Sequence, residues 1–183
     1  MRGSLVTLRA YGQDDVAAFH ELWNDEEGHL LLADVPFRPT SPERIKARFD
    51  KLISEPPDAL TGDVWLAAVA NETSEVLGNV GLWGVNPYHA RAHLGLWLRP
   101  SVRGRGYGTD IVELLCEYGF RYRNLRRLIL DTLKSNAAMR AVAQKVGFTL
   151  EGTLRHHVYD GDEYADQVVY GLLREEWRPV PTA

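Results

Sequence analysis

The residues that first suggest chemistry lie between Leu94 and Thr109, in the sequence LGLWLRPSVRGRGYGT. A short apolar run is followed by Pro100 and by a turn with three glycines and two arginines, after which apolar residues resume at helical spacing. A helix start offers unpaired N–H groups and a partial positive charge, and glycine lets a ligand approach the backbone closely. The order strand, glycine-rich turn, helix therefore predicts a site for a phosphorylated ligand.

The spacing of this turn argues against two common nucleotide sites. A P-loop requires Gly-x-x-x-x-Gly-Lys followed by Ser or Thr, and the sequence contains no such string. A dinucleotide fingerprint requires Gly-x-Gly-x-x-Gly, but Gly104 and Gly106 are followed by Thr109 where the third glycine belongs. A nucleotide- or dinucleotide-binding enzyme is therefore the disfavoured hypothesis.

The turn does match Arg103-x-x-Gly106-x-Gly108 after a short strand, and here the chain resembles the GNAT superfamily of N-acetyltransferases. The segment NAAMRAVAQKVGF, which starts at Asn136, is similar to the family's next helix and its closing Gly-Phe pair. Residues 6–25 and 152–177 are similar to the branch that acetylates N-terminal residues of ribosomal proteins, together with many small-molecule relatives. The resemblance covers nearly the whole chain and is more specific for the family than for the substrate.

This resemblance implies where acetyl-coenzyme A binds. In the family the glycine-rich loop wraps the pyrophosphate, and the preceding strand pairs with the pantetheine arm, so that a backbone N–H faces the thioester carbonyl. Asn136 resembles the residue that hydrogen-bonds the coenzyme arm, and it is equally suited to capping the helix that it begins. No metal is expected. The residues expected to bind the coenzyme are Leu96, Trp97, Leu98, Arg103, Gly104, Arg105, Gly106, Tyr107, Gly108, Thr109 and Asn136.

Acetyl transfer to an amine also requires a base, because alkyl amines are mostly protonated at neutral pH. Asp131 lies where part of the superfamily places a glutamate base, and strand alternation puts it on one face with Ile129 and Leu133. His93 is the second candidate, at the entrance of the central strand where relatives often carry glutamate. The alternatives are a carboxylate that faces water and a histidine packed in a strand.

The acid that protonates the leaving thiolate is where the sequence departs from the family. The tyrosine that many members carry seven positions after the asparagine is Ala143 here, and the serine that the ribosomal-protein branch often carries three positions after it is Met139. Tyr107, Tyr159 and Tyr164 remain as candidate acids beside water, and Tyr164 is taken as the catalytic one.

The rest of the chain predicts the elements that position these residues. Strands are expected over 5–10, 64–70, 76–85, 94–98, 127–133, 149–159 and 163–172. Helices are expected over 14–23, from Ser41-Pro42 to Pro56, over 107–118 and over 136–146, with an irregular segment over 24–40. This order predicts one α/β domain over 1–178, a mixed, mostly antiparallel GNAT-like sheet of about seven strands flanked by about four helices, and a loose tail over 179–183. The resemblance implies that the coenzyme lies where the strands around Trp97 and Asp131 splay apart.

Composition narrows the class of protein further. The chain has 183 residues, of which 45% are hydrophobic and 25% charged, as in ordinary globular domains. Its net charge of 21 − 25 = −4 argues against a nucleic-acid partner. Cys116 has no second cysteine to pair with, and its apolar neighbours make it a core residue. No apolar run is long enough for a bilayer, so no membrane partner and a cytoplasmic location are expected.

The main functional hypothesis is an acetyl-CoA-dependent N-acetyltransferase in which a primary amine attacks the thioester directly. The amine belongs to a protein N-terminus or to a small molecule such as an antibiotic or a polyamine, and acidic residues around Asp160 lean toward a cationic substrate. The alternative, motivated by the missing acid, is a non-catalytic acyl-CoA-binding sensor or interaction module. A homodimer formed through the last strands is compatible with the family.

Overall fold

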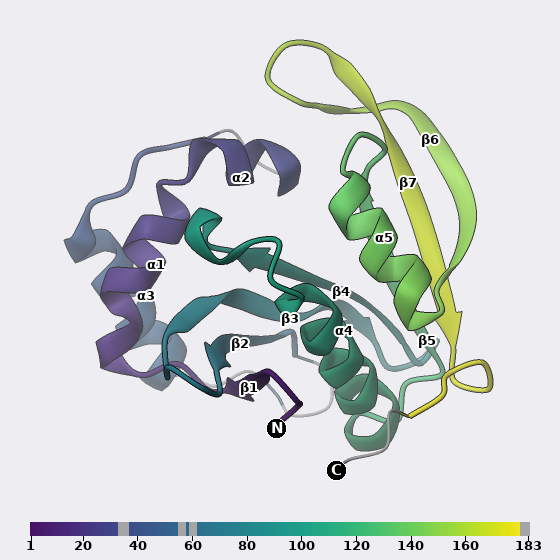
Figure 1. Ribbon diagram of the computed structural model, residues 1–183, viewed down its shortest axis with the longest axis horizontal. Helices are drawn as coiled ribbons and strands as arrows, with labels where there is room; N and C mark the ends of the chain where they lie inside the picture. The colour runs from purple at the N-terminus through teal and green to yellow at the C-terminus, as the bar shows by residue number, and fades with distance from the viewer. Residues whose placement is uncertain (33–36, 55–57, 59–61, 180–183) are drawn as a thin grey trace.

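The computed structural model describes residues 1–32, 37–54, 58 and 62–179. Within these residues a 7-stranded sheet runs in the order β1-β2-β3-β4-β5-β7-β6, and only β4 and β5 pair in parallel (Figure 1). The strands are β1 Val6–Arg9, β2 Val64–Ala70, β3 Val76–Asn86, β4 Arg91–Leu98, β5 Arg127–Leu133, β6 Thr149–Tyr159 and β7 Tyr164–Leu173. The α-helices are α1 Val16–Trp23, α2 Glu26–Leu32, α3 Pro42–Ser54, α4 Tyr107–Glu117 and α5 Ala137–Val146. The expected mixed, mostly antiparallel α/β sheet is confirmed.

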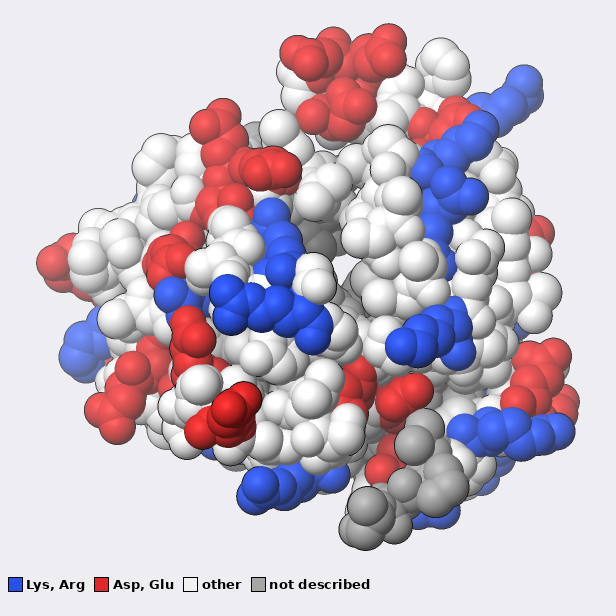
Figure 2. Space-filling view, in the orientation of Figure 1, with Lys and Arg blue, Asp and Glu red and all other residues white. Residues whose placement is uncertain are grey.

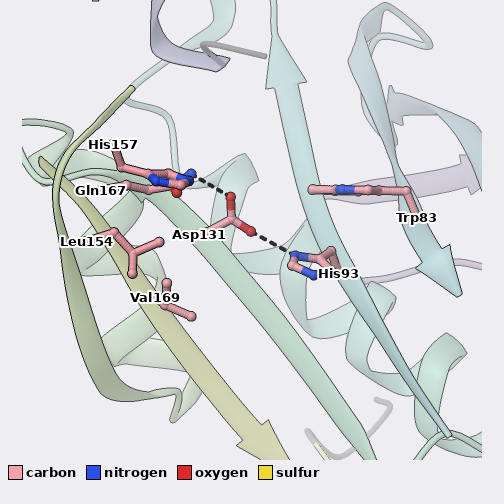
Figure 3. A pocket seen from close by; sticks show the side chains of 7 residues that line it. All are labelled: Trp83, His93, Asp131, Leu154, His157, Gln167 and Val169. Carbon is pink, nitrogen blue, oxygen red and sulfur yellow. Dashed lines mark hydrogen bonds and ion pairs between the residues drawn. The ribbon is translucent and has the colours of Figure 1, made fainter. Parts of the chain in front are cut away.

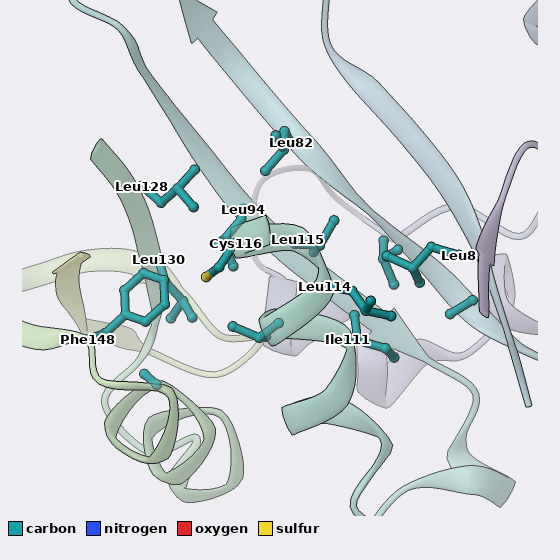
Figure 4. Close-up of a cluster of buried hydrophobic side chains, with 14 of the residues drawn as sticks. Leu8, Leu82, Leu94, Ile111, Leu114, Leu115, Cys116, Leu128, Leu130 and Phe148 are labelled. Carbon is teal, nitrogen blue, oxygen red and sulfur yellow. The ribbon is translucent and has the colours of Figure 1, made fainter. Parts of the chain in front are cut away.

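The larger part of the core lies between the sheet and the helices α4 and α5 (Figure 4). Because side chains alternate along a strand, every second residue in the middle of β3, β4 and β5 points to this side, for example Leu82, Leu94 and Leu128. The apolar stripe of α4 covers them, and the fully buried Cys116 lies in it. Burial raises the pKa of the Cys116 thiol, in keeping with a core residue and not a nucleophile.

A smaller core lies on the opposite face of the sheet, under α1 and α3. It is formed by Phe19 and Leu22 of α1, Ile45 and Phe49 of α3, and the odd-numbered residues of β2. The predicted start of α3 is confirmed, since Ser41 accepts a hydrogen bond from the N–H of Arg44 at 3.4 Å. Ile53, which was expected in the same stripe, is exposed; because α3 packs on α1, its buried stripe is narrow.

Two elements differ from the sequence predictions. Helix α2 lies in the segment expected to be irregular and raises the number of α-helices in the described residues to five; its third residue is Gly28, which lowers helix propensity. Strand β4 begins at Arg91, because the residues before Leu94 pair with β5. Residues 33–36 of that segment and 180–183 of the expected tail lie outside the described residues. Among the described helices, none is both long and apolar enough to cross a membrane.

Candidate active site

The parallel strands β4 and β5 separate after a short contact. Their pairing joins Arg91, Ala92 and His93 to Arg127, Leu128 and Ile129, and within the described residues it ends there. Beyond this point β4 continues to Leu98 beside β3, and β5 continues to Leu133 beside β7. The expected splaying of the strands is therefore present in the structure.

The separated part of β4 has a main-chain edge that pairs with no strand among the described residues. Arg99 donates its N–H to the carbonyl oxygen of Leu77 at 2.9 Å, so the alternate residue Trp97 also directs its main chain toward β3, opposite Asn79. The N–H groups of Leu96 and Leu98 then point to the side where β5 has departed. Of the three strand residues expected to bind the pantetheine arm, Leu96 and Leu98 face the gap with their main chain, whereas Trp97 does not.

The glycine-rich turn delivers the start of α4 to the same region. Gly104 and Gly106 have φ angles of 76° and 86°, a left-handed conformation that favours glycine, and Gly106 is the residue that precedes α4. The first amides of α4 have no acceptor within their own helix, and the preceding Arg105 is exposed. Figure 2 shows Lys and Arg side chains on both sides of a central hollow, which in the shared orientation of Figure 1 lies between this turn and α5. These groups suit a pyrophosphate.

Arg103 is the exception among the residues of this turn. Its guanidinium pairs with the carboxylate of Asp25, just before α2, and its Nε donates to the carbonyl oxygen of Leu98 at 3.1 Å. The sequence assigned this side chain to the coenzyme, whereas the structure connects it to protein groups on both sides.

Asn136 has the capping role that the sequence left open. Its side-chain oxygen accepts a hydrogen bond from the N–H of Met139 at 3.1 Å, and its amide nitrogen donates to Thr132 of β5 at 3.1 Å. Gly147 ends the same helix, α5, with a φ of 101°. The cap fixes the start of α5 at the end of β5, beside the gap between the strands.

His93 and Asp131 meet where β4 and β5 separate (Figure 3). The Nδ1 atom of His93 lies 2.8 Å from Oδ1 of Asp131, and the amide nitrogen of Gln167 on β7 donates to Oδ2 at 2.8 Å. The side chains of both candidate bases are partly buried, so neither is simply a solvated charge. The sequence proposed these two residues as separate candidates, and the structure makes them one hydrogen-bonded unit.

Two tryptophans extend this unit across the sheet. Trp83 of β3 stacks on His93 with ring centroids 5.8 Å apart, and Trp65 of β2 stacks on Trp83 at 5.7 Å. The indoles occupy space left by a cross-strand glycine pair: a Cβ on Gly81 would lie 2.7 Å from Trp65, and a Cβ on Gly95 would lie 2.8 Å from Trp83. The two tryptophans thus hold the imidazole of His93 from one side, and Gln167 holds the carboxylate of Asp131 from the other.

Comparison with known proteins decides the family. The model of the acetyltransferase (GNAT) domain matches residues 6–149, which is more than half of the chain. The chain belongs to the GNAT acetyltransferase family. It is an acetyl-CoA-dependent N-acetyltransferase that acts on an amine.

Relatives with known names are similar over one half to nearly all of their length. The spermidine N(1)-acetyltransferase of Escherichia coli strain K12 is 26% identical over 172 residues, 94% of this chain and 88% of that protein. The ribosomal-protein-serine acetyltransferase of the same strain is 28% identical over 54% of this chain and 55% of that protein. The spermidine N-acetyltransferase of Vibrio cholerae, solved with CoA and spermine, has a TM-score of 0.80 at 20% identity and covers 93% of this chain and 96% of its own.

The acetyltransferase has a cavity of about 330 Å³ beside the His93–Asp131 unit. Three side chains of its lining are largely apolar and four are polar, so it fits a small organic group next to a hydrogen-bonding centre. The lining residues are Trp83, His93, Asp131, Leu154, His157, Gln167 and Val169. No role was predicted for Gln167 from the sequence, although its place two residues before Val169 on an alternating strand puts both side chains on one face.

The tyrosines considered as acids are not part of this cavity. Tyr164 is 64% exposed and packs edge-on against Tyr159 at the turn between β6 and β7. Tyr159 donates its hydroxyl to the carbonyl oxygen of Gly161 at 2.7 Å. Ala143, at the family's tyrosine position, is buried in the core of the acetyltransferase. Tyr164 is therefore not brought together with His93 and Asp131, because the long β6–β7 hairpin carries it to the tip.

Replacing Trp83 by leucine is expected to reduce kcat about tenfold while the affinity for acetyl-CoA stays within twofold of the wild type. The substitution removes the ring that stacks on the imidazole of His93, one of the two candidate bases, and an orientation error at a reacting group lowers the rate. Steady-state kinetics and calorimetric titration measure the two quantities. Trp83→Phe keeps an aromatic face at the same place and should recover most of the rate; equal losses in both variants would exclude a stacking role.

Proposed function

We propose that the acetyltransferase uses His93 as its general base and acetylates the α-amine of a peptide or a similar amine without a second nearby ammonium group. The observation that carries the assignment of the base is the 2.8 Å hydrogen bond between His93 and Asp131 at the point where β4 and β5 separate. This pair lies next to both the separated edge of β4 and the cavity.

Asp131 fixes which nitrogen of His93 is basic. An ionised carboxylate accepts only, so the imidazole carries its proton on Nδ1 and leaves the lone pair on Nε2. The hydrogen bond from Gln167 keeps the carboxylate in place. This arrangement supports an imidazole that takes a proton from an amine and whose resulting cation the carboxylate stabilises.

The reaction then needs one proton acceptor in the cavity and no dedicated acid. The amine nitrogen forms a bond to the acetyl carbon, the carbon–sulfur bond breaks, and the proton of the attacking amine passes to Nε2 of His93. A free thiol has a pKa of about 8.5, so the departing thiolate is a good leaving group that water can protonate. The absence of a tyrosine or serine at Ala143 and Met139 is compatible with this scheme.

The charges around the cavity support an acceptor with a single amine. Both oxygens of Asp131, the carboxylate in the lining, have partners in His93 and Gln167. The acidic residues of the β6–β7 hairpin that suggested a cationic substrate are partly used by the fold: Asp160 accepts N–H groups of its own turn, and Asp166 pairs with Lys134. The apolar wall of Leu154 and Val169 suits an uncharged first side chain.

Thiol release from acetyl-CoA with a panel of acceptors tests this assignment. Peptides that begin with serine or alanine are expected to give a kcat/KM at least tenfold above that of spermidine. The same peptides with a blocked N-terminus are the matched control and should give no turnover above the rate of hydrolysis. A preference for spermidine would contradict the acceptor proposed here and would align the chain with relatives named for that substrate.

A further inference from the structure

The ion pair between Arg103 and Asp25 joins two segments that are 78 positions apart in the chain. The side chain of Asp25 is only 7% exposed, and its two oxygens have different tasks. Oδ1 accepts the N–H of Gly28 at 3.1 Å, which caps the first turn of α2, and Oδ2 receives the guanidinium of Arg103. The carboxylate therefore holds together the start of α2 and the glycine-rich turn, residues 103–108.

Gly28 packs closely against this pair. Gly28 is buried, and any larger residue there would add a Cβ atom. That atom would lie 2.6 Å from a guanidinium nitrogen of Arg103 and 2.6 Å from the indole nitrogen of Trp97. It would also collide with the carboxylate of Asp25. Arg103 in addition donates its Nε to Leu98, the last residue of β4. Glycine at position 28 is thus the residue that lets α2 settle onto the pair and onto the end of β4.

Helix α2 contacts both β4 and β5, the two strands that separate from each other. His29 packs edge-on against Trp97 with ring centroids 5.8 Å apart. Leu30 reaches the turn between β6 and β7, where its side chain would lie 3.1 Å from a Cβ on Gly161. The helix therefore bridges the two halves of the sheet on the face that carries His93 and Trp97.

We propose that Arg103 is a positioning residue that fixes α2 on the face of the sheet that carries His93, where the acceptor amine is expected, and that it is not a ligand of the coenzyme phosphates. A phosphate that took over the guanidinium would leave the buried carboxylate of Asp25 without its partner, which is costly for a desolvated charge. Arg105, two residues further along the same turn, is exposed and is the arginine that can bind phosphate without this cost. The inference rests on the acetyltransferase activity and not on which residue is the base.

Three single substitutions separate the two roles. Asp25→Asn retains an oxygen that can cap α2 but loses the charge that Arg103 pairs with; Arg103→Met removes the other partner; Arg105→Met is the matched control in the same turn. The acceptor is whichever of the peptide and spermidine is turned over. Asp25→Asn and Arg103→Met are each expected to raise the acceptor KM about tenfold and to keep the Kd of acetyl-CoA, measured by calorimetry, within twofold of the wild type. Arg105→Met is expected to raise the Kd of acetyl-CoA about tenfold and to keep the acceptor KM within twofold of the wild type.

The double substitution and a glycine variant make the test stricter. Because both residues act through one contact, Asp25→Asn combined with Arg103→Met should raise KM no more than either change alone. Gly28→Ala should also raise the acceptor KM, although alanine favours helix more than glycine does. A loss of acetyl-CoA affinity above threefold in Arg103→Met, or an unchanged acceptor KM in Asp25→Asn, overturns the proposal. Melting temperatures identify any variant that has lost its fold, in which case Asp25→Asn alone decides.

Discussion

Gly106→Glu is expected to abolish saturable binding of acetyl-CoA, with a Kd raised at least a hundredfold in calorimetric titration. Gly106 immediately precedes α4 and has a φ of 86°, a conformation that costs other residues about 1–2 kcal/mol. A glutamate there also places a negative charge at the helix N-terminus, where the backbone amides and the partial positive charge favour the anionic ligand. Backbone strain and charge repulsion therefore both lower the affinity for acetyl-CoA.

Gly106→Lys separates these two causes. Lysine carries the same backbone strain but the opposite charge, so it should retain binding within about tenfold of the wild type. If Gly106→Glu binds acetyl-CoA as the wild type does, the turn is not the pyrophosphate site. If both variants lose binding equally, the backbone conformation matters and the charge at the helix start does not.

His93→Gln is expected to lower kcat by about 10²–10⁴, the usual contribution of a general base, and to leave the Kd of acetyl-CoA within threefold of the wild type. Glutamine can still hydrogen-bond to Asp131 but offers no basic nitrogen to the amine. Asp131→Asn should lower kcat at least tenfold, because the imidazole loses the group that sets its tautomer and stabilises its cation.

His89→Gln is the control for these two variants, because His89 is an exposed histidine at the turn that precedes β4. It should leave kcat and KM unchanged. A kcat for His93→Gln within threefold of the wild type would remove His93 as the base, and a normal rate for Asp131→Asn would show that the hydrogen bond between them is structural only.

The pattern of the sequence was sufficient for most of the fold, because alternation and helical spacing depend on neighbours in the chain. Alternation placed Asp131 on the face away from the core residues Leu128 and Leu130, as the structure has it. It could not show that His93 and Asp131 touch, because that contact depends on β4 and β5 being adjacent and parallel. Gln167 and Trp83 join the site through the same cross-strand registers.

In the glycine-rich turn, residues 103–108, the local backbone conformation was predictable but the partner of one side chain was not. Two of its glycines, Gly104 and Gly106, adopt the left-handed conformation that their residue type permits, whereas Gly108 lies within α4. The role of Arg103 was inferred from its neighbours in the turn, whereas its partner Asp25 lies in a segment that was expected to be irregular. A helix of seven residues with a glycine in its first turn gives little sequence signal, so neither α2 nor the ion pair beneath it was predicted.

Rescue of His93→Ala by free imidazole tests the central claim most directly. The substitution leaves a space between Trp83 and Asp131 that a small imidazole can enter, and a base supplied from solution should then replace the missing side chain. Thiol release by the variant is expected to rise at least tenfold with added imidazole and to saturate, while the wild type does not respond. A variant that binds acetyl-CoA normally, has lost its activity and shows no response to imidazole would contradict the assignment of His93 as the base, and so would a variant with undiminished activity.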